Sequence, residues 1–241
     1  MRTHGALWRL YRRARGAARR KRDEELTFWQ GRKEAEGTLG NEHYEAQYTQ
    51  LVGLEPSFYA GKDVLDIGCG PRGSLTWMVE ARRRVGLDPL ADDYRALGTG
   101  EHPMEYVTGA AEEMPFDDAS FDVVTSFNSF DHVDDLDRTI AEIKRVLRPQ
   151  GHLVLAVEVG HAPTWSEPQT VTWDVCARFE PELEVVDARE YERGTGILYD
   201  GAWRGEIFDH SDPAPRAGVL VAVLRGAQSE RAAATASSQS E

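Results

Sequence analysis

Between residues 61 and 160 the chain alternates two patterns of apolar and polar positions. Short, mostly apolar runs such as residues 63–67 (DVLDI) and 152–159 (HLVLAVEV) predict β-strands that are buried on both faces. Between such runs, apolar residues recur every three or four positions and predict helices. The clearest helix covers 134–147, where Leu136, Ile140, Ile143 and Leu147 share one face behind an acidic cap. Strands that alternate with helices in this way predict parallel βαβ units and an α/β fold.

The same reading predicts the remaining elements. Further strands are expected at 84–88, 104–109, 120–127, 183–190 and 218–225, and helices at 41–52, 73–82, 89–97 and 167–179. Asn41 is the expected cap of the first of these helices. Residues 191–217 show no helical period, so the last strand is expected to run antiparallel beside its predecessor. Within that link, Asp200-Gly201 is typical of a hairpin turn.

The chain divides into three parts by composition. Residues 1–40 predict a basic helical extension, 41–225 one α/β domain, and 226–241 a small, polar, disordered tail. No apolar run approaches the roughly 18 residues that a membrane span needs, and the first residues lack the apolar core of a secretory signal. With only two cysteines, Cys69 and Cys176, the expected location is the reducing cytoplasm.

Charge is distributed unevenly. Residues 1–22 carry nine Arg or Lys and no acid, and the net charge of -13 therefore leaves -22 for residues 23–241. An acidic body of this kind argues against nucleic acid as the partner. The basic helix suits an anionic membrane surface or an acidic partner, and it equally suits solvent or the acidic body itself. The sequence leaves these alternatives and the oligomeric state open.

A glycine-rich loop follows the first buried strand. Gly68, Gly70 and Gly73 spell G-x-G-x-x-G, which is typical of a nucleotide-binding turn between a strand and a helix. Asp88 ends the next strand, where an acid binds ribose hydroxyls. Asp66 precedes the loop, and at the mouth of the site its carboxylate would repel a pyrophosphate and attract an ammonium or sulfonium group. The loop therefore favours S-adenosylmethionine over a nicotinamide dinucleotide.

Four segments then resemble the class I S-adenosylmethionine-dependent methyltransferases, in the type 11 branch that contains quinone-biosynthesis enzymes. They are VLDIGCGPRG, VGLDPL, GAAEEMPFDDASFDVVTSFNSFDHV and EIKRVLRPQGHLVLAV, within about residues 41–160. The resemblance implies a Rossmann-like, seven-stranded, mostly parallel sheet with an antiparallel last strand and helices on both faces. The residues expected to bind the cosubstrate are Asp66, Gly68, Cys69, Gly70, Arg72, Asp88, Pro89, Ala111, Glu112, Phe127 and Asn128. The chain departs from the family at Arg72, where glycine is usual, and at Ala110, where Asp is common.

Methyl transfer needs a positioned nucleophile and exclusion of water, and a base only if the acceptor must lose a proton. Candidates for contact with the acceptor lie in loops after the fourth and fifth strands: Asp131 and His132, and then His161. Tyr44 and Tyr48 are candidates for a lid. No metal-ligand spacing is present, so no metal is predicted. The predicted function is methyl transfer to an oxygen, nitrogen or carbon of a small molecule. The alternatives are an RNA or protein methyltransferase that docks through the basic N-terminus, an NAD-linked oxidoreductase, and a non-catalytic S-adenosylmethionine-binding protein.

Overall fold

A seven-stranded sheet forms the centre of the protein in the computed structural model, which describes residues 4–196 and 198–227, with side chains from residue 20 onward. Its strands are β1 (Asp63–Ile67), β2 (Arg83–Asp88), β3 (Glu105–Thr108), β4 (Phe121–Phe127), β5 (Leu147–Val159), β6 (Leu183–Glu192) and β7 (Gly218–Gly226). They lie in the order β3-β2-β1-β4-β5-β7-β6. β7 is antiparallel to both of its neighbours, and the pairs among β1 to β5 are parallel. The predicted fold and the antiparallel last strand are confirmed.

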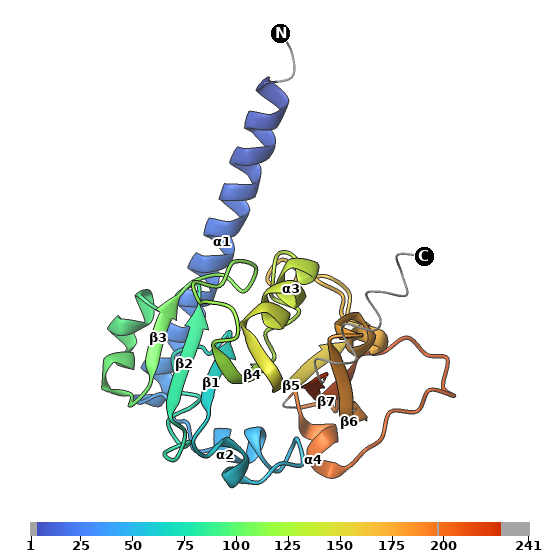
Figure 1. Ribbon diagram of the computed structural model, residues 1–241. Coiled ribbons are helices and arrows are strands. Elements are labelled where there is room, and N and C mark those ends of the chain that lie inside the picture. The colour runs from blue at the N-terminus through green and yellow to red at the C-terminus, as the bar shows by residue number, and fades with distance from the viewer. Residues whose placement is uncertain (1–3, 197, 228–241) are drawn as a thin grey trace, which may run out of the picture.

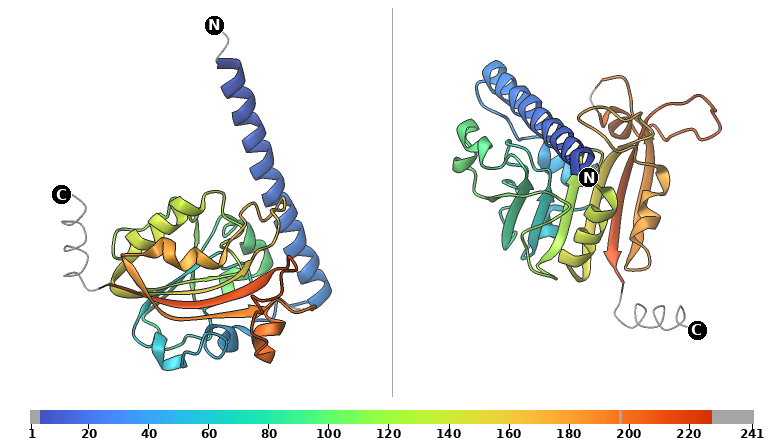
Figure 2. Two further views of the ribbon diagram at one scale, coloured as in Figure 1. Left: turned by 90° about the vertical axis from the view of Figure 1, so that its right-hand side faces the viewer. Right: turned by 90° about the horizontal axis from the view of Figure 1, so that it is seen from above.

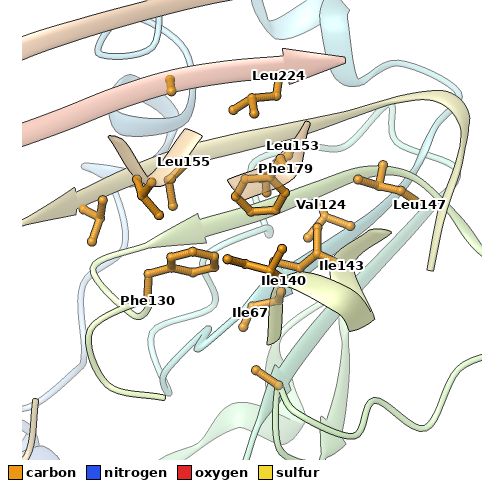
Figure 3. Packing of buried hydrophobic residues seen from close by; sticks show 14 of the residues in the cluster. Ile67, Val124, Phe130, Ile140, Ile143, Leu147, Leu153, Leu155, Phe179 and Leu224 are labelled. Carbon is orange, nitrogen blue, oxygen red and sulfur yellow. The ribbon is translucent and has the colours of Figure 1, made fainter. Parts of the chain in front are cut away.

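The sheet is covered on both faces (Figure 2). On one face, α3 (Leu136–Val146) and the 3₁₀ helix η4 (Trp173–Phe179) pack on Leu65, Ile67 and their neighbours (Figure 3). On the other, α2 (Tyr44–Tyr48), the 3₁₀ helix η1 (Pro56–Tyr59) and residues 75–78 pack on Val64 and its neighbours. Alternate residues of β1 thus serve opposite cores, which explains why the strand is apolar throughout.

The helix predicted at 134–147 forms as α3. Asp135 is its cap and accepts a hydrogen bond from the backbone N–H of Arg138 at 3.1 Å. Its apolar face buries Leu136, Ile140 and Ile143 against the sheet, each worth roughly 1.5–3 kcal/mol of transfer free energy.

Five predicted local structures differ in the molecule. Residues 73–82 form successive turns rather than a helix, because Thr76 closes the first turn by bonding to Gly73 through both its N–H and its hydroxyl. Residues 89–97 and 167–179 yield only the 3₁₀ helices η2 (Asp93–Leu97) and η4. A third, shorter 3₁₀ helix, η3 (Thr99–Glu101), precedes β3.

Asn41 does not cap a helix over 41–52. Its side-chain amide donates to the Thr76 hydroxyl at 2.9 Å, and only the five residues of α2 are helical. Asp200-Gly201 begins a short helix, α4 (Asp200–Arg204), and not a hairpin turn. A side chain at position 201 would lie 1.8 Å from the carbonyl oxygen of Glu192, so this glycine permits close backbone packing.

The first helix, α1 (His4–Glu36), stands partly clear of the body (Figure 1). Its C-terminal part packs on the body through a small apolar cluster in which Leu26 and Trp29 contact Leu39, Leu90, Tyr94 and Leu97. The predicted tail lies almost wholly outside the described residues. Within the described ranges, no helix combines the length and apolarity needed to cross a membrane. Cys69 and Cys176 are both buried and free.

Candidate active site

A cavity of about 700 Å³ opens at the carboxyl ends of β1, β2 and β4. This is the edge where open α/β sheets bind their ligands. The strand and loop residues that line it are Ile67, Gly68, Leu87, Asp88, Pro89, Leu90, Gly109, Ala110, Ala111, Glu112, Asn128, Ser129, His132, Val133 and Asp134. Residues Lys21, Arg22, Asp23 and Glu25 of α1 complete the wall.

Backbone geometry holds the glycine loop against the strand ends. Gly68 has a φ of 69° and donates its N–H to the carbonyl of Leu87 at 2.8 Å. A Cβ at position 68 would lie 2.4 Å from that of Ser129, so only glycine fits. Gly70 also has a positive φ, and its missing side chain lets the Trp29 ring approach from α1.

Asp88 lies in the cavity wall and is buried. One carboxylate oxygen accepts the N–H of Leu90 at 2.9 Å, and the other accepts the N–H of Gly70 at 3.2 Å. Burial, with the negative charge of Glu25 nearby, raises the pKa of Asp88 to about 7. The carboxylate therefore links the second strand to the glycine loop and still faces the cavity.

Asp66 does not lie at the mouth of the cavity as the sequence suggested. It is 1% exposed and accepts hydrogen bonds from three hydroxyls: Tyr48 at 2.9 Å, Ser74 at 2.5 Å and Thr125 at 2.7 Å. Burial raises its pKa to about 6, against the effect of these donors. In this structure Asp66 organises the loop from behind.

The segment predicted to hold the adenine also reaches the cavity. Ala111 and Glu112 line it, together with Ala110, which stands where the family often has Asp. Glu112 accepts the backbone N–H groups of Asp134 and Asp135 at 2.6 and 3.1 Å. Its carboxylate thus connects the segment after β3 with the loop after β4.

Several other predicted residues lie near the cavity without lining it. Cys69 is buried behind the loop, where its sulfur packs on Gly86. Phe127 stacks on Tyr48 at 4.0 Å, while the neighbouring Asn128 reaches the cavity wall. Arg72 is engaged elsewhere: its guanidinium makes two 2.8 Å hydrogen bonds to the Glu36 carboxylate and one to the Gly40 carbonyl.

Tyr48, predicted as a lid residue, is 2% exposed and is part of the core behind Asp66. Tyr44 packs edge-on against it. The position over the cavity is taken instead by α1, whose contribution sequence reasoning missed. Lys21, Glu25 and Trp29 recur at intervals of four, and this spacing was the available signal that one helix face turns toward the site.

The candidate acceptor residues come together where β4 and β5 end. Asp131 is buried, and one of its carboxylate oxygens lies 3.3 Å from Nε2 of His161. Nε2 of His132 lies 3.8 Å from a carboxylate oxygen of Glu167, and His132 also lines the cavity. Burial raises the pKa of Asp131. Residues far apart in the sequence thus form one polar cluster beside the cavity.

Comparison with known proteins agrees with this geometry. Residues 65–155 match the family model described as a methyltransferase domain. Those residues include β1, β2, β3, β4, α3 and most of β5, which together carry the cavity. In its fold and in this match, the chain is similar to the class I S-adenosylmethionine-dependent methyltransferases, whose cosubstrate is S-adenosylmethionine.

Individual relatives cover parts of the chain. A phthiotriol/phenolphthiotriol dimycocerosates methyltransferase of Mycobacterium leprae is 37% identical over 40% of this chain and 38% of its own. A demethylmenaquinone methyltransferase of Thermobifida fusca is 31% identical over 56% of this chain and 58% of its own. The chain thus spans between about a third and three-fifths of the length of these curated relatives.

Among solved structures, an S-adenosylmethionine-dependent methyltransferase from Mesorhizobium loti superposes with a TM-score of 0.51. It is 19% identical and covers 73% of this chain and 99% of its own. At this identity the likeness shows the fold alone.

Proposed function

We propose that this chain transfers a methyl group from S-adenosylmethionine to an oxygen, nitrogen or carbon of a small-molecule acceptor. The observation that carries the proposal is the cavity that joins the glycine loop at Gly68, the strand-end acid Asp88 and the segment 110–112. Its volume of about 700 Å³ falls within the range for cofactor-sized ligands. The two relatives described above that match part of this chain are methyltransferases.

In this proposal each wall of the cavity has one task. Asp88 accepts hydrogen bonds from the ribose hydroxyls, the loop at Gly68 approaches the amino-acid portion, and Ala111 and Glu112 flank the adenine. The wall carries five acidic side chains against the two basic ones of Lys21 and Arg22, and this excess of acid favours a sulfonium cation over a pyrophosphate. The acids are Asp23, Glu25, Asp88, Glu112 and Asp134. Helix α1 excludes water from above, which the displacement at carbon requires.

The acceptor side is proposed to lie beside the loop after β4. His132 is the one candidate base that lines the cavity among the described residues, and it neighbours the polar cluster formed with Asp131, His161 and Glu167. The methyl carbon would face this loop, because the Ser129 hydroxyl donates to the Ile67 carbonyl at 2.7 Å and so holds the loop against the end of β1, where the glycine turn begins.

Titration calorimetry tests the cosubstrate. We expect S-adenosylmethionine and S-adenosylhomocysteine to bind with micromolar Kd values, and NAD to bind at least 100-fold more weakly. Incubation with isotopically labelled methyl donor and a metabolite extract, followed by mass spectrometry, then tests the transfer through a labelled methyl gain. Tighter binding of NAD than of both sulfur compounds would refute the assignment. Binding of the cosubstrate without any labelled product would favour a non-catalytic role.

A further inference from the structure

The polar cluster beside the cavity brings together groups that are ligands of metal ions. Ligand atoms of Asp131, His132 and Glu167 all lie within 4.8 Å of one another. His161 is not part of that group of three, but its Nε2 lies 3.3 Å from a carboxylate oxygen of Asp131. In a tetrahedral site with bonds of about 2.1 Å, neighbouring ligand atoms lie about 3.4 Å apart. The separations of 3.3 Å and 3.8 Å between the histidines and carboxylates are close to this value.

Two buried atoms in the cluster have no hydrogen-bond partner. They are Oδ1 of Asp131, in a residue that is 2% exposed, and Nε2 of His161. An orphaned carboxylate oxygen in the interior is costly, and a protein that keeps one normally supplies a partner. Among the described residues no lysine or arginine pairs with Asp131; its one ion-pair partner is His161.

The hydrogen bond at the other nitrogen of His161 indicates which ring nitrogen carries the proton. Nδ1 lies 2.9 Å from the carbonyl oxygen of Ala162, and a carbonyl only accepts, so Nδ1 carries the proton. In the neutral ring, Nε2 then presents a lone pair toward the Asp131 carboxylate. Two acceptors 3.3 Å apart repel each other unless a proton or a metal ion offsets the repulsion. A backbone carbonyl on the far nitrogen is also the usual partner of a metal-binding histidine.

Glu167 is positioned in a similar way. Its Oε2 accepts the Thr164 hydroxyl at 3.0 Å, and its backbone N–H donates to the same hydroxyl oxygen at 3.0 Å. The other oxygen, Oε1, is thereby directed toward His132. The loop is closed at its base by the bond from Gly160 N–H to Val171 O, and the Gln169 N–H bonds to the Asp131 carbonyl. The carboxylate is thus oriented before any ligand arrives.

We propose that Asp131, His132 and Glu167 form a divalent metal site at the edge of the cosubstrate cavity, with His161 next to Asp131 at the rim of the site. Mixed imidazole and carboxylate ligands suit a first-row metal better than Mg²⁺, so the expected order of affinity is Zn²⁺, then Mn²⁺, then Mg²⁺. If the proposed methyl transfer is correct, an open position on the metal would hold an oxygen of the acceptor, such as an enol, phenol or carboxylate. The metal binding itself does not depend on that function.

Metal titration of the full, tag-free, EDTA-stripped chain tests the site. We expect one metal ion per chain, either Zn²⁺ or Mn²⁺, with a micromolar Kd. Calorimetry measures both metals, and the loss of the electron paramagnetic resonance signal of free Mn²⁺ measures Mn²⁺ binding independently. Glu167→Gln and His132→Asn should each weaken binding at least tenfold. Thr164→Val, which removes only the support of Glu167, should weaken it less.

The matched control is His210→Asn. His210 also pairs with a glutamate, Glu190, but on the surface and away from the cluster, so this variant should bind metal as the wild type does. Thermal melting without metal verifies that each variant is folded, and Zn²⁺ should raise the melting temperature of the wild type but not of Glu167→Gln.

Two results would overturn the site: no stoichiometric binding by the wild type, or binding that Glu167→Gln and His132→Asn leave unchanged. Cosubstrate binding is measured separately in the same samples. Glu167 does not line the cavity, so Glu167→Gln should retain S-adenosylmethionine binding. If S-adenosylmethionine fails to bind but metal does, the proposed function fails and the metal site stands.

Discussion

At the scale of single residues, two buried carboxyls set the chemistry of the cavity. Asp66 and Asp88 have pKa values raised to about 6 and about 7, mainly by burial. Asp88 is fixed between the N–H groups of Leu90 and Gly70, whereas Asp66 is fixed by hydroxyls. One carboxyl therefore contacts the ligand space and the other supports the loop that forms it.

The raised pKa of Asp88 predicts a pH-dependent affinity. Ribose hydroxyls and a sulfonium both favour the ionised carboxylate, so S-adenosylmethionine lowers this pKa and its binding releases a proton. The association constant should rise between pH 5.5 and 7, by at most tenfold per unit, and level off above about 7.5. Calorimetry in buffers of different ionisation enthalpy measures the number of protons released when S-adenosylmethionine binds. Asp88→Asn should bind roughly 10- to 100-fold more weakly at pH 8, with a flatter profile. A flat wild-type profile would contradict this role for Asp88.

Two glycines with the same backbone conformation allow a matched test of the loop. Gly61 and Gly68 have φ values of 68° and 69°, but a Cβ meets nothing within 4 Å at position 61 and meets Ser129 at 2.4 Å at position 68. Gly61→Ala should cost only the conformational strain, about 1–2 kcal/mol. Gly68→Ala should cost a further 1–3 kcal/mol or so, from overpacking, and should weaken S-adenosylmethionine binding. Urea unfolding of both variants measures the difference in the free energy of unfolding. Equal losses of that free energy would show that the structure avoids the contact with Ser129 at little energetic cost.

At the scale of elements, α1 is the part that turns an open strand edge into a covered cavity. Its C-terminal half is held by Trp29 over the glycine loop and by the paired hydrogen bonds between Glu36 and Arg72. Lys21 donates to the backbone carbonyl of His132 and lies 3.3 Å from Asp134, which ties the helix to the loop after β4. The cover is therefore held by polar contacts together with the apolar cluster of Leu26 and Trp29.

Loosening this helix should speed exchange of the cosubstrate. Glu36→Gln removes the charge that pairs with Arg72, so amide hydrogens over residues 21–36 should exchange faster and S-adenosylmethionine should dissociate faster. Glu34→Gln, an exposed glutamate on the same helix, is the control and should change neither. Hydrogen exchange followed by mass spectrometry measures the amide exchange rates of the helix, and stopped-flow displacement measures the dissociation rate of S-adenosylmethionine. Equal behaviour of the two variants would argue against α1 as a cover.

At the scale of the whole molecule, charge separates along the chain. Nine basic residues lie in 1–22 and a net charge of -22 in the remainder. Such a molecule should bind an anionic surface through α1, with each basic residue near the surface contributing about 1 kcal/mol.

Vesicle sedimentation tests this separation of charge. The full chain should co-sediment with phosphatidylglycerol vesicles at low salt, and a variant without residues 1–19 should not. Binding should fall steeply as salt is raised, because the Debye length shortens from about 30 Å at 0.01 M to about 8 Å at 0.15 M. Neutral phosphatidylcholine vesicles are the control. Retention that is independent of both salt and residues 1–19 would show that another surface is responsible.

Sequence reasoning reached the sheet because its strands are buried on both faces and therefore apolar throughout. The antiparallel β7 followed from the long link before it, although that link contains the short helix α4. Helices were predicted less well. At 73–82 the predicted helix is replaced by turns, because the Thr76 hydroxyl bonds to the backbone carbonyl of Gly73. The spacing of Lys21, Glu25 and Trp29 indicated a face of α1 that turns inward, but not what that face covers. That contact and the cluster of Asp131 with Glu167 join residues some 35 positions apart, which local patterns do not reveal.

The continuity of α1 has a mechanical consequence. It is one continuous helix of 33 residues, about 50 Å long, so its projecting end and the part over the cavity belong to the same element. A displacement of the projecting end should therefore also move residues 21–23 and 25, which line the cavity. We therefore expect a partner that binds this end of α1 to change how long S-adenosylmethionine stays in the cavity.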